Sequence, residues 1–478
     1  MISPFKNFTE KLLRRCPTIC RNDSDTLFRY SFDGLKIGFA PELVVIPEAE
    51  ADIPRILEIA NEGKVPLTVR GAGSTLTGSA TPVQGGWVMD LSQLNHVQID
   101  PVHRMADVGC GAVIKTIQEA ASAANLFYPP DPSSDKWCTI GGNIACNAGG
   151  LRCVKYGVTR DYVIGLRGFL PTGEYVEWGK PVRKFSVAYN IRDLWIGSEG
   201  TLGVITGATL KLIPKPKFKR TLLCGFKDER DALQAILELL SQGITPSILE
   251  FIDSLSVKGA EEVNHKTFFG GMDHPPVVLL EVDGDESQVA TDYETIVRWA
   301  KSRASALKEA STDAEAESLW EVRRTCSSAM FRLGNSKLNE DVVVPLGNMP
   351  ALMDFIQELR REHSMPIAVF GHAGDGNLHV NIMYNREDRE MSAAAGKCLL
   401  ALMEKVVALN GAISGEHGVG LAKSEFLGLQ YSEAQIALMQ RVKSVFDPNG
   451  IMNPGKLFTP FSPWKHEKIT YRLPWDKN

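Results

Sequence analysis

Long apolar runs are missing from this sequence. No stretch of about 18 apolar residues, the length that suggests a membrane-spanning helix, occurs in its 478 residues. Blocks of basic residues are missing too, and the formal net charge of −5 argues against a nucleic-acid partner. The segment 1–20 has no continuous apolar core and contains Glu10, so we expect no secretory signal there. These absences predict an ordinary globular protein without a membrane span.

A disulfide or iron–sulfur framework is also missing. The nine cysteines are odd in number and dispersed, which predicts free thiols in a reducing compartment. Cys138, Cys146 and Cys153 are too widely spaced for the usual iron–sulfur runs, and Cys16 and Cys20 lack further thiol companions. We therefore expect any iron–sulfur cluster to lie on another chain.

The order of apolar strands and helical patterns predicts an α+β protein. "LVVIP", "EADIPRILEIANEG" and "VPLTVR", between residues 43 and 70, read as strand, helix and strand. A basic stretch with two prolines at 210–220 predicts a domain boundary. Beyond it, two successive β-α-β patterns predict an antiparallel sheet with helices on one side.

The segment "FGHAGDGNLHVN", residues 370–381, carries two histidines around a turn. Asp375-Gly376 predicts a two-residue hairpin loop of type I′, which would pair His372 directly with His379. Opposed side chains on one face lie close enough to share one metal ion. The alternative, two histidines of an ordinary surface turn, stays open until a third ligand is found.

A third ligand is offered by "ISGEHGVG", residues 413–420. Two imidazoles and one carboxylate, from His372, His379 and Glu416, leave open coordination positions, as in catalytic metal sites. The adjacent His417 cannot easily point at the same ion, so we expect it to act as a base. A helix cap or surface turn is the alternative interpretation of this pair.

Three glycine-rich segments in the first half indicate a ligand site. "VRGAGSTLTG" (69–78) is typical of a phosphate cradle, because small residues let backbone N–H groups approach a pyrophosphate. It is not a Rossmann fingerprint, since Leu76 stands where the third glycine belongs. "TIGGNIACNAGG" (139–150) and "IGSEGTLGVIT" (196–206) indicate close approach to something flat or polyanionic. The alternative is that these glycines only serve turns.

Together with "YPPDPSS" (128–134), this ordered series resembles the flavin-binding half of the vanillyl-alcohol-oxidase type, also called the p-cresol methylhydroxylase type. The resemblance implies FAD, held non-covalently between two α+β subdomains. It implies that the pyrophosphate is wrapped by Arg70, Gly71, Ala72, Gly73, Ser74, Thr75, Thr77 and Gly78. It further implies that the adenosine and isoalloxazine are lined by Pro130, Ser133, Gly141, Gly142, Asn143, Asn147, Gly149, Gly150, Glu199, Gly203 and Ile205.

The second half resembles FAD-linked oxidases that act on D-2-hydroxy acids, through "GHAGDGNLHVN", "GEHGVG" and "NPGK" (453–456). The resemblance implies that the two histidines and Glu416 bind a divalent metal (zinc, manganese or iron) and that His417 accepts the proton. Asn381 and Asn453 would line the substrate and flavin sites. We expect an FAD-binding domain at 1–218, a substrate domain carrying the metal at 219–420, and a return segment at 421–478 that packs on the FAD domain.

A clamp for the substrate carboxylate is also implied by this resemblance. In "LWEVRRTCSS", Arg323 would bind the carboxylate in a bidentate manner, and Ser327 keeps the hydroxyl of the related threonine. The lysine position of the family holds Asn339 here, and Lys337, two residues earlier on the same strand face, would substitute for it.

These features predict an FAD-dependent dehydrogenase for D-2-hydroxy acids, with D-lactate first and glycolate next. Electrons would pass to a partner: an electron-transfer flavoprotein, an iron–sulfur subunit, a cytochrome or a quinone. We expect a cytoplasmic location, with attachment to the inner membrane through that partner. Two alternatives remain: a metal-free flavoenzyme of the same fold, and an FAD-carrying subunit that only transfers electrons or scaffolds a complex.

Overall fold

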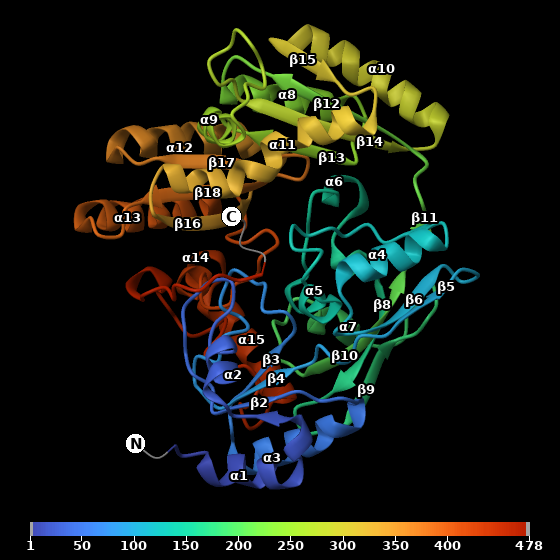
Figure 1. The fold of residues 1–478 in the computed structure, drawn as a ribbon, viewed down its shortest axis with the longest axis vertical. Helices are drawn as coiled ribbons and strands as arrows, with labels where there is room; N and C mark the ends of the chain where they lie inside the picture. The colour runs from blue at the N-terminus through green and yellow to red at the C-terminus, as the bar shows by residue number, and fades with distance from the viewer. Residues whose placement is uncertain (1–2, 475–478) are drawn as a thin grey trace. The chain divides into compact units, whose positions relative to one another are not determined.

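The computed structural model describes residues 3–474, which form two compact units. The first unit comprises the chain up to residue 149, residues 158–215 and the chain from 416 onward. The second unit comprises 150–157 and 216–415. Figure 1 colours the chain from one end to the other and labels most of the helices and strands of both units.

The first sheet of the first unit contains the predicted β-α-β arrangement. Its strands run in the order β1-β2-β4-β3, and β2, β4 and β3 are parallel. The bounds are β1 (Cys20–Arg21), β2 (Leu43–Val45), β3 (Leu67–Arg70), β4 (Trp87–Asp90), α1 (Lys6–Arg15), α2 (Ser24–Arg29) and α3 (Ile53–Gly63). In α3 the apolar side chains of Ile53, Ile56, Leu57 and Ala60 are buried, because their spacing places them on one helix face.

A five-stranded antiparallel sheet in the order β5-β6-β10-β8-β9 completes the core of the first unit. Its strands are β5 (Val97–Asp100), β6 (Met105–Gly109), β8 (Val163–Phe169), β9 (Tyr175–Gly179) and β10 (Val204–Lys211). The remaining elements of this unit are α4 (Ile114–Ala123), β7 (Leu126–Phe127), α5 (Ile140–Cys146), α7 (Ile191–Trp195), β11 (Ile213–Pro214), α14 (Leu427–Gln430) and α15 (Glu433–Phe446). Leu67 of β3 forms a parallel bridge with Met452, so the end of the chain joins the first sheet.

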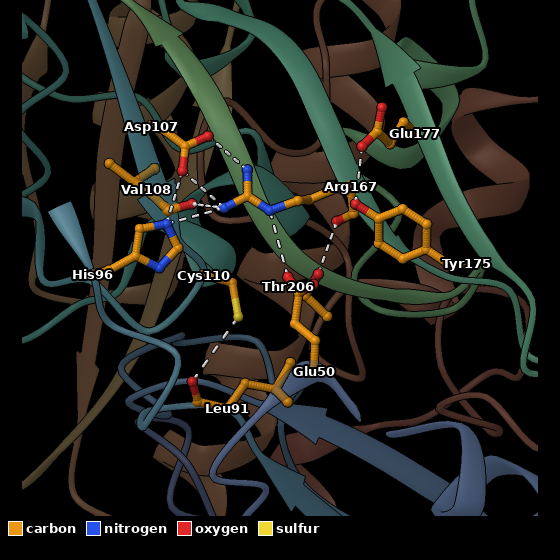
Figure 2. Close-up of polar contacts among 10 residues, drawn as sticks. All are labelled: Glu50, Leu91, His96, Asp107, Val108, Cys110, Arg167, Tyr175, Glu177 and Thr206. Atoms are coloured by element: carbon orange, nitrogen blue, oxygen red, sulfur yellow. Dashed lines mark hydrogen bonds and ion pairs between the residues drawn. The ribbon is translucent and has the colours of Figure 1, made fainter. Parts of the chain in front are cut away.

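An ion network crosses the five-stranded sheet (Figure 2). The Arg167 guanidinium on β8 bonds both carboxylate oxygens of Asp107 on β6, at 2.8 and 3.0 Å, and lies 3.4 Å from Glu50. His96 lies within 2.8 Å of the same aspartate. Gly207 on β10 leaves room for this guanidinium, because a Cβ there would lie 2.5 Å from its central carbon. The network belongs to the scaffold of the first unit.

The second unit is built on a seven-stranded antiparallel sheet in the order β15-β12-β14-β13-β17-β18-β16. Its strands are β12 (Phe218–Gly225), β13 (Ile248–Ile252), β14 (Val277–Gly284), β15 (Ala306–Glu309), β16 (Ser336–Val343), β17 (Ile367–His372) and β18 (Asn377–Tyr384). Its helices are α6 (Cys153–Tyr156), α8 (Glu229–Ser241), α9 (Ser254–Asn264), α10 (Glu286–Arg303), α11 (Asp313–Ala329), α12 (Met349–His363) and α13 (Arg389–Ala408). The predicted α+β class and antiparallel sheet are confirmed.

Helices cover both faces of this sheet, which is more than the single covered side predicted from the sequence. Residues of α9 and α11 join Leu223, Leu279 and Phe370 in one hydrophobic core. The alternate residues, such as Leu222 and Leu280, are also fully buried, and α10 contacts β12 and β14 while α13 contacts β18. The face under α11 is the one that carries the polar residues described below.

Two further features concern all of residues 3–474. No helix in this range is long and apolar enough to cross a membrane. All nine cysteines lie in the range and are free thiols.

Candidate functional site

The predicted histidine hairpin exists, but its predicted register is wrong. β17 and β18 pair Phe370 with His379, not His372 with His379. The loop is longer than two residues because Gly374 donates its N–H to Leu249 of the neighbouring strand at 3.2 Å. Of the two predicted turn residues only Gly376 has a positive φ, of 81°, whereas a type I′ turn requires two. A contact from another strand therefore overrides the local turn preference.

The two imidazoles nevertheless meet, as a diagonal pair on one face of the sheet. His372 and His379 are 5% and 7% exposed, and their Nε2 atoms lie 3.4 Å apart. The ring planes are almost perpendicular at 88°, with centroids 5.1 Å apart. Two nitrogens bound at 2.0–2.1 Å to a tetrahedral zinc lie about 3.3–3.4 Å apart. The pair is therefore spaced as two ligands of one ion would be.

Glu250 on β13 orients the first of these histidines. It lies opposite His372 in the sheet and accepts a hydrogen bond from the His372 Nδ1–H. Burial alone would raise the pKa of Glu250, but the adjacent His372 and Arg323 lower it to about 2. A carboxylate that holds one ring nitrogen leaves the other directed at a metal, and such partners are typical of histidine metal ligands.

Glu416, the third predicted ligand, directly follows Gly415, the last residue of the second unit, and its place in the ligand set stays a prediction. Asp341 on β16 holds the chain just before it, accepting hydrogen bonds from the Gly415 N–H at 2.9 Å and the Ser414 hydroxyl at 3.2 Å. This donor set of two imidazoles and a carboxylate fits zinc, manganese or iron.

The predicted carboxylate clamp lies on the same face of the sheet. Arg323 of α11 donates from Nε to Glu250 and lies over the Phe370 ring at 4.8 Å. One buried carboxylate thus joins the predicted substrate arginine to a predicted metal ligand. The helix that carries Arg323 begins at a capping box formed by Thr312 and Glu315.

Ser327 and Lys337 are also brought together. The Lys337 ammonium donates to the Ser327 hydroxyl at 3.2 Å and lies over the Phe331 ring at 5.5 Å. Asn339, which occupies the lysine position of the family, pairs with Asn381 on β18. Alternation along β16 therefore places Lys337, Asn339 and Asp341 on one face.

Asn381 is fully buried on this face. Its side-chain N–H₂ donates to the carbonyl oxygens of His379 at 3.1 Å and Ala368 at 3.4 Å. Its amide oxygen has no donor among the described residues. A buried acceptor without a donor fits a site in which a ligand supplies the polar hydrogen.

The predicted pyrophosphate loop follows β3 in the first unit. Gly73 and Gly78 have positive φ values of 69° and 79°. Arg70 is buried, and its guanidinium donates a hydrogen bond to the Phe32 carbonyl at 2.6 Å. This contact fixes the side chain that begins the loop. Thr75 and Thr77 bond each other through their hydroxyls at 3.0 Å.

A cavity of about 440 Å³ borders this loop. Its lining includes Ala72 of the loop, Gly111, Trp137 and Thr139. Thr139 is also the N-cap of α5, where its hydroxyl accepts the Gly142 N–H at 3.4 Å. Gly71, Ala72 and Ser74 of the loop are partly exposed. These small residues and N–H groups fit the phosphate-bearing part of a dinucleotide cofactor.

Other residues that the resemblance assigns to the flavin site contact other parts of the chain. A Cβ on Gly141 would lie 2.8 Å from that of Cys110, and one on Gly203 would lie 2.7 Å from the Trp195 ring. Asn143 donates to Cys138, and Asn147 accepts the Arg160 N–H. Pro130, Gly149, Gly150 and Ile205 are buried, whereas Ser133 is exposed. Their contact with FAD stays a prediction.

Glu199 and Asn453 are engaged with the chain itself. The Asn453 amide donates to the carbonyl oxygens of Glu199 at 2.7 Å and Ser79 at 2.8 Å, and its oxygen accepts from Lys456. The Glu199 carboxylate accepts backbone N–H groups of the segment that carries His417. The His417 side chain is 20% exposed, with its Nε2 atom 3.8 Å from Glu416.

Sequence reasoning missed Glu250 and Asp341 as supports of the metal cluster. Glu250 lies in "SILEFID", a strand buried on both faces. A glutamate in such a strand was the feature that could have indicated a buried polar partner. Asp341 lies in "NEDVVVP", where an acidic residue on the face of Lys337 was the signal. Both residues lie far from the histidines in sequence, so only strand pairing could connect them.

Comparisons with known proteins identify the family of both halves of the chain. Residues 41–179 match the FAD binding domain family, and residues 215–457 match the family described as FAD linked oxidases, C-terminal domain. The chain is 37% identical over 435 residues to the glycolate oxidase subunit GlcD of Bacillus subtilis, covering 90% of this chain and 92% of that one. It is 34% identical over 426 residues to the D-lactate dehydrogenase of Anaerostipes hadrus, covering 87% and 89%.

Solved structures with low sequence identity share the fold. p-Cresol methylhydroxylase with substrate bound superposes with a TM-score of 0.80 at 16% identity, covering 96% of this chain and 97% of that one. This likeness confirms the fold that the glycine segments implied. The two matching domains and the similarity along nearly the whole chain show that this protein belongs to the family of FAD-linked oxidases.

Proposed function

We propose that this protein is an FAD-dependent dehydrogenase that oxidises a D-2-hydroxy acid to the 2-oxo acid, with D-lactate as first candidate and glycolate as second. The observation that carries the proposal is the buried His372–His379 pair, whose Nε2 atoms lie 3.4 Å apart, as two ligands of one ion would. The similarity to proteins named glycolate oxidase subunit and D-lactate dehydrogenase supports the substrate class.

The residues have separate roles in this proposal. His372, His379 and Glu416 hold a divalent ion, and the small residues around Ala72 hold FAD non-covalently. When bound, the ion acidifies a coordinated hydroxyl and FAD accepts a hydride. His417 takes the hydroxyl proton, because it is adjacent to the ligand Glu416 and is itself outside the ligand set.

Arg323 binds the substrate carboxylate in this proposal, with help from Ser327 and Lys337. A guanidinium presents parallel N–H donors to a carboxylate, which fixes the orientation of the substrate Cα–H. Glu250 keeps the arginine in place through its Nε. The buried Asn381 oxygen provides an acceptor on the same face. A positive charge beside a Lewis acid suits a small anion that carries both a hydroxyl and a carboxylate.

The oxidation of one substrate molecule would give one proton to His417 and one hydride, with its two electrons, to FAD. We propose a protein or quinone acceptor for them: an electron-transfer flavoprotein, an iron–sulfur subunit, a cytochrome or a quinone. The nine free cysteines support an acceptor outside this chain, because none is paired in a cluster with other metal ligands in residues 3–474. Attachment to the inner membrane through such a partner stays a prediction.

Anaerobic bleaching of the flavin tests the proposal. The purified protein, loaded with FAD and with Zn²⁺ or Mn²⁺, is mixed with D-lactate, L-lactate, glycolate or D-2-hydroxyglutarate, before and after chelation. We expect a D-2-hydroxy acid to bleach the flavin, the chelator to abolish bleaching, and added metal to restore it. Bleaching that ignores the chelator would favour a metal-free flavoenzyme. Bound FAD that no hydroxy acid reduces would favour an electron-transfer or scaffold subunit.

A further inference from the structure

The backbone of the segment 416–422, which carries His417, is held from three sides within the first unit. The Glu199 carboxylate accepts the Val419 N–H at 2.7 Å and the Gly420 N–H at 2.8 Å, one on each oxygen. The Thr77 carbonyl accepts the N–H groups that follow, those of residues 421 and 422, at 2.7 and 3.0 Å. The Gly420 carbonyl accepts the N–H of residue 457 at 3.1 Å. Three other parts of the chain, at Thr77, Glu199 and residue 457, therefore converge on this one segment.

The glycines of this segment permit that close approach. Gly418 has a φ of 83°, and a Cβ there would lie 2.8 Å from a Glu199 carboxylate oxygen. Gly420 has a φ of 51°, and a Cβ there would lie 2.4 Å from the Thr77 carbonyl oxygen. Side chains would be strained and crowded at both positions. The spacing of "GVG" after His417 therefore serves contact with Glu199 and Thr77.

Glu199 is itself held in an unusual conformation. Its φ is 51°, a left-handed value uncommon for residues other than glycine. Its N–H donates to the Ala145 carbonyl at 2.8 Å, and its carbonyl accepts from Asn453. Such strain persists where the surroundings over-determine the backbone, and it clusters at functional sites. The side chain is 5% exposed, so it faces the segment and not solvent.

Two opposing effects act on the charge of Glu199. Burial raises the pKa of Glu199 to about 7, and the two N–H groups and the nearby Lys456 and Lys423 act in the opposite direction. An ionised carboxylate is a stronger acceptor for two N–H groups than a neutral one.

We propose that Glu199 is a positioning residue for His417: its carboxylate holds the backbone at Val419 and Gly420 and so sets where the imidazole lies. The motif resemblance implies that Glu199 lines the flavin, and that contact stays a prediction; both of its carboxylate oxygens accept N–H groups of the chain. This inference rests on the proposed function for the role of His417 as base, but the hydrogen bonds stand without it.

A general base must lie within hydrogen-bond reach of its proton, and small displacements are costly. Loosening two N–H contacts, two and three residues after His417, should lower kcat about 10- to 100-fold, because two buried hydrogen bonds are weakened together. KM should change less than about threefold, because the substrate carboxylate binds to Arg323 and Ser327 and not to this segment.

Two variants distinguish the effect of the length of the Glu199 side chain from the effect of its charge. Glu199→Gln keeps the length but offers one acceptor oxygen and places an N–H₂ against the other N–H. Glu199→Asp keeps the charge beside Lys456 but is one methylene too short to reach both amides, and it serves if the glutamine variant fails to fold. The matched control is Asp447→Asn, because Asp447 is also a buried carboxylate that accepts two backbone N–H groups, from Ile451 and Met452.

The holoenzyme and its variants are compared by amide hydrogen exchange over 417–422, flavin content, and kcat and KM. We expect both Glu199 variants to keep FAD, but the amides of 417–422 should exchange at least tenfold faster and kcat should fall. Asp447→Asn should leave the exchange rates and kcat at their wild-type values. Loss of FAD with wild-type exchange and wild-type kcat per bound flavin would overturn the proposal. Equal loss of kcat in the control would overturn it too.

The exchange measurement separates this inference from the proposed function. If the wild-type protein oxidises no 2-hydroxy acid, the proposed function fails and the role of His417 as base fails with it. Faster exchange in the Glu199 variants would still support the anchoring of the segment. Unchanged exchange would overturn the anchoring whatever the activity.

Discussion

The two units hold their predicted site residues in different ways. In the second unit, His372, His379, Asn381 and Lys337 lie on paired β-strands, so alternation along each strand decides which face every side chain takes. In the first unit most of the predicted flavin residues lie in connections and in the short helix α5, while Arg70 ends β3 and Ile205 lies on β10. There the polar side chains of four residues form hydrogen bonds with other parts of the chain: Arg70, Asn147, Glu199 and Asn453.

A sequence motif predicts different properties on a strand and in a connection. On a strand, the period of two predicts the direction of a side chain without knowledge of its partners. In a glycine-rich connection, the motif predicts that the backbone comes close to something, but the neighbour can be a ligand or another segment of the chain. We expect substitutions in the second unit to affect chemistry, and those in the first unit to divide between stability and cofactor binding.

The largest expected effect is the loss of a strand-borne metal ligand. His379→Asn should lower turnover about 10³-fold or more, because several kcal/mol of charge stabilisation depend on the ion. Metal content by elemental analysis should fall with it. His363→Asn, at the end of α12, is the control and should keep both metal and turnover. Wild-type turnover in the His379 variant would contradict the metal site.

The support of that ligand should have a smaller effect. Glu250→Gln should weaken metal binding about 10- to 100-fold, the usual result of losing the carboxylate behind a histidine ligand. Titration with Zn²⁺ or Mn²⁺ measures it. Glu281→Gln is a matched control on the adjacent strand, where Glu281 is buried and accepts from Thr221. Equal metal affinity in both variants would show that Glu250 does not orient His372.

A pair of neighbouring glycines divides stability from cofactor binding in the first unit. Gly141→Ala should lower the free energy of unfolding by about 1–3 kcal/mol through overpacking against Cys110. Gly142→Ala meets nothing closer than 3.5 Å, so it should change stability by less than about 0.5 kcal/mol and weaken FAD binding instead. Thermal unfolding and flavin fluorescence give the two readouts. Equal behaviour of the two variants would remove the distinction.

The smallest expected effect concerns the substituted lysine. Lys337→Gln should raise KM less than about fivefold, because an exposed ammonium contributes at most about 1 kcal/mol. Lys308→Gln is the control, since Lys308 also lies over an aromatic ring, at 5.5 Å, and it should leave KM unchanged. A larger rise for Lys337→Gln would show that this residue fully replaces the family lysine.

The interpretation of the hairpin shows where sequence reasoning stops. Periodicity correctly placed His372, His379 and Asn381 on one face, because that property is local. The register differed by two residues because the Gly374 N–H binds Leu249, a contact between distant segments. The error did not separate the histidines, since a shift of two residues keeps the same face.

Local sequence alone determined the α+β class, the β-α-β start, the strand faces and the candidate ligands, because these follow from spacing and side-chain chemistry. Tertiary structure decided which distant residues support them. Glu250 reaches His372 only through the pairing of β13 with β17, and Glu199 reaches the segment of His417 only through folding of the first unit. Their partners lie more than a hundred residues away, and no local pattern encodes such a contact.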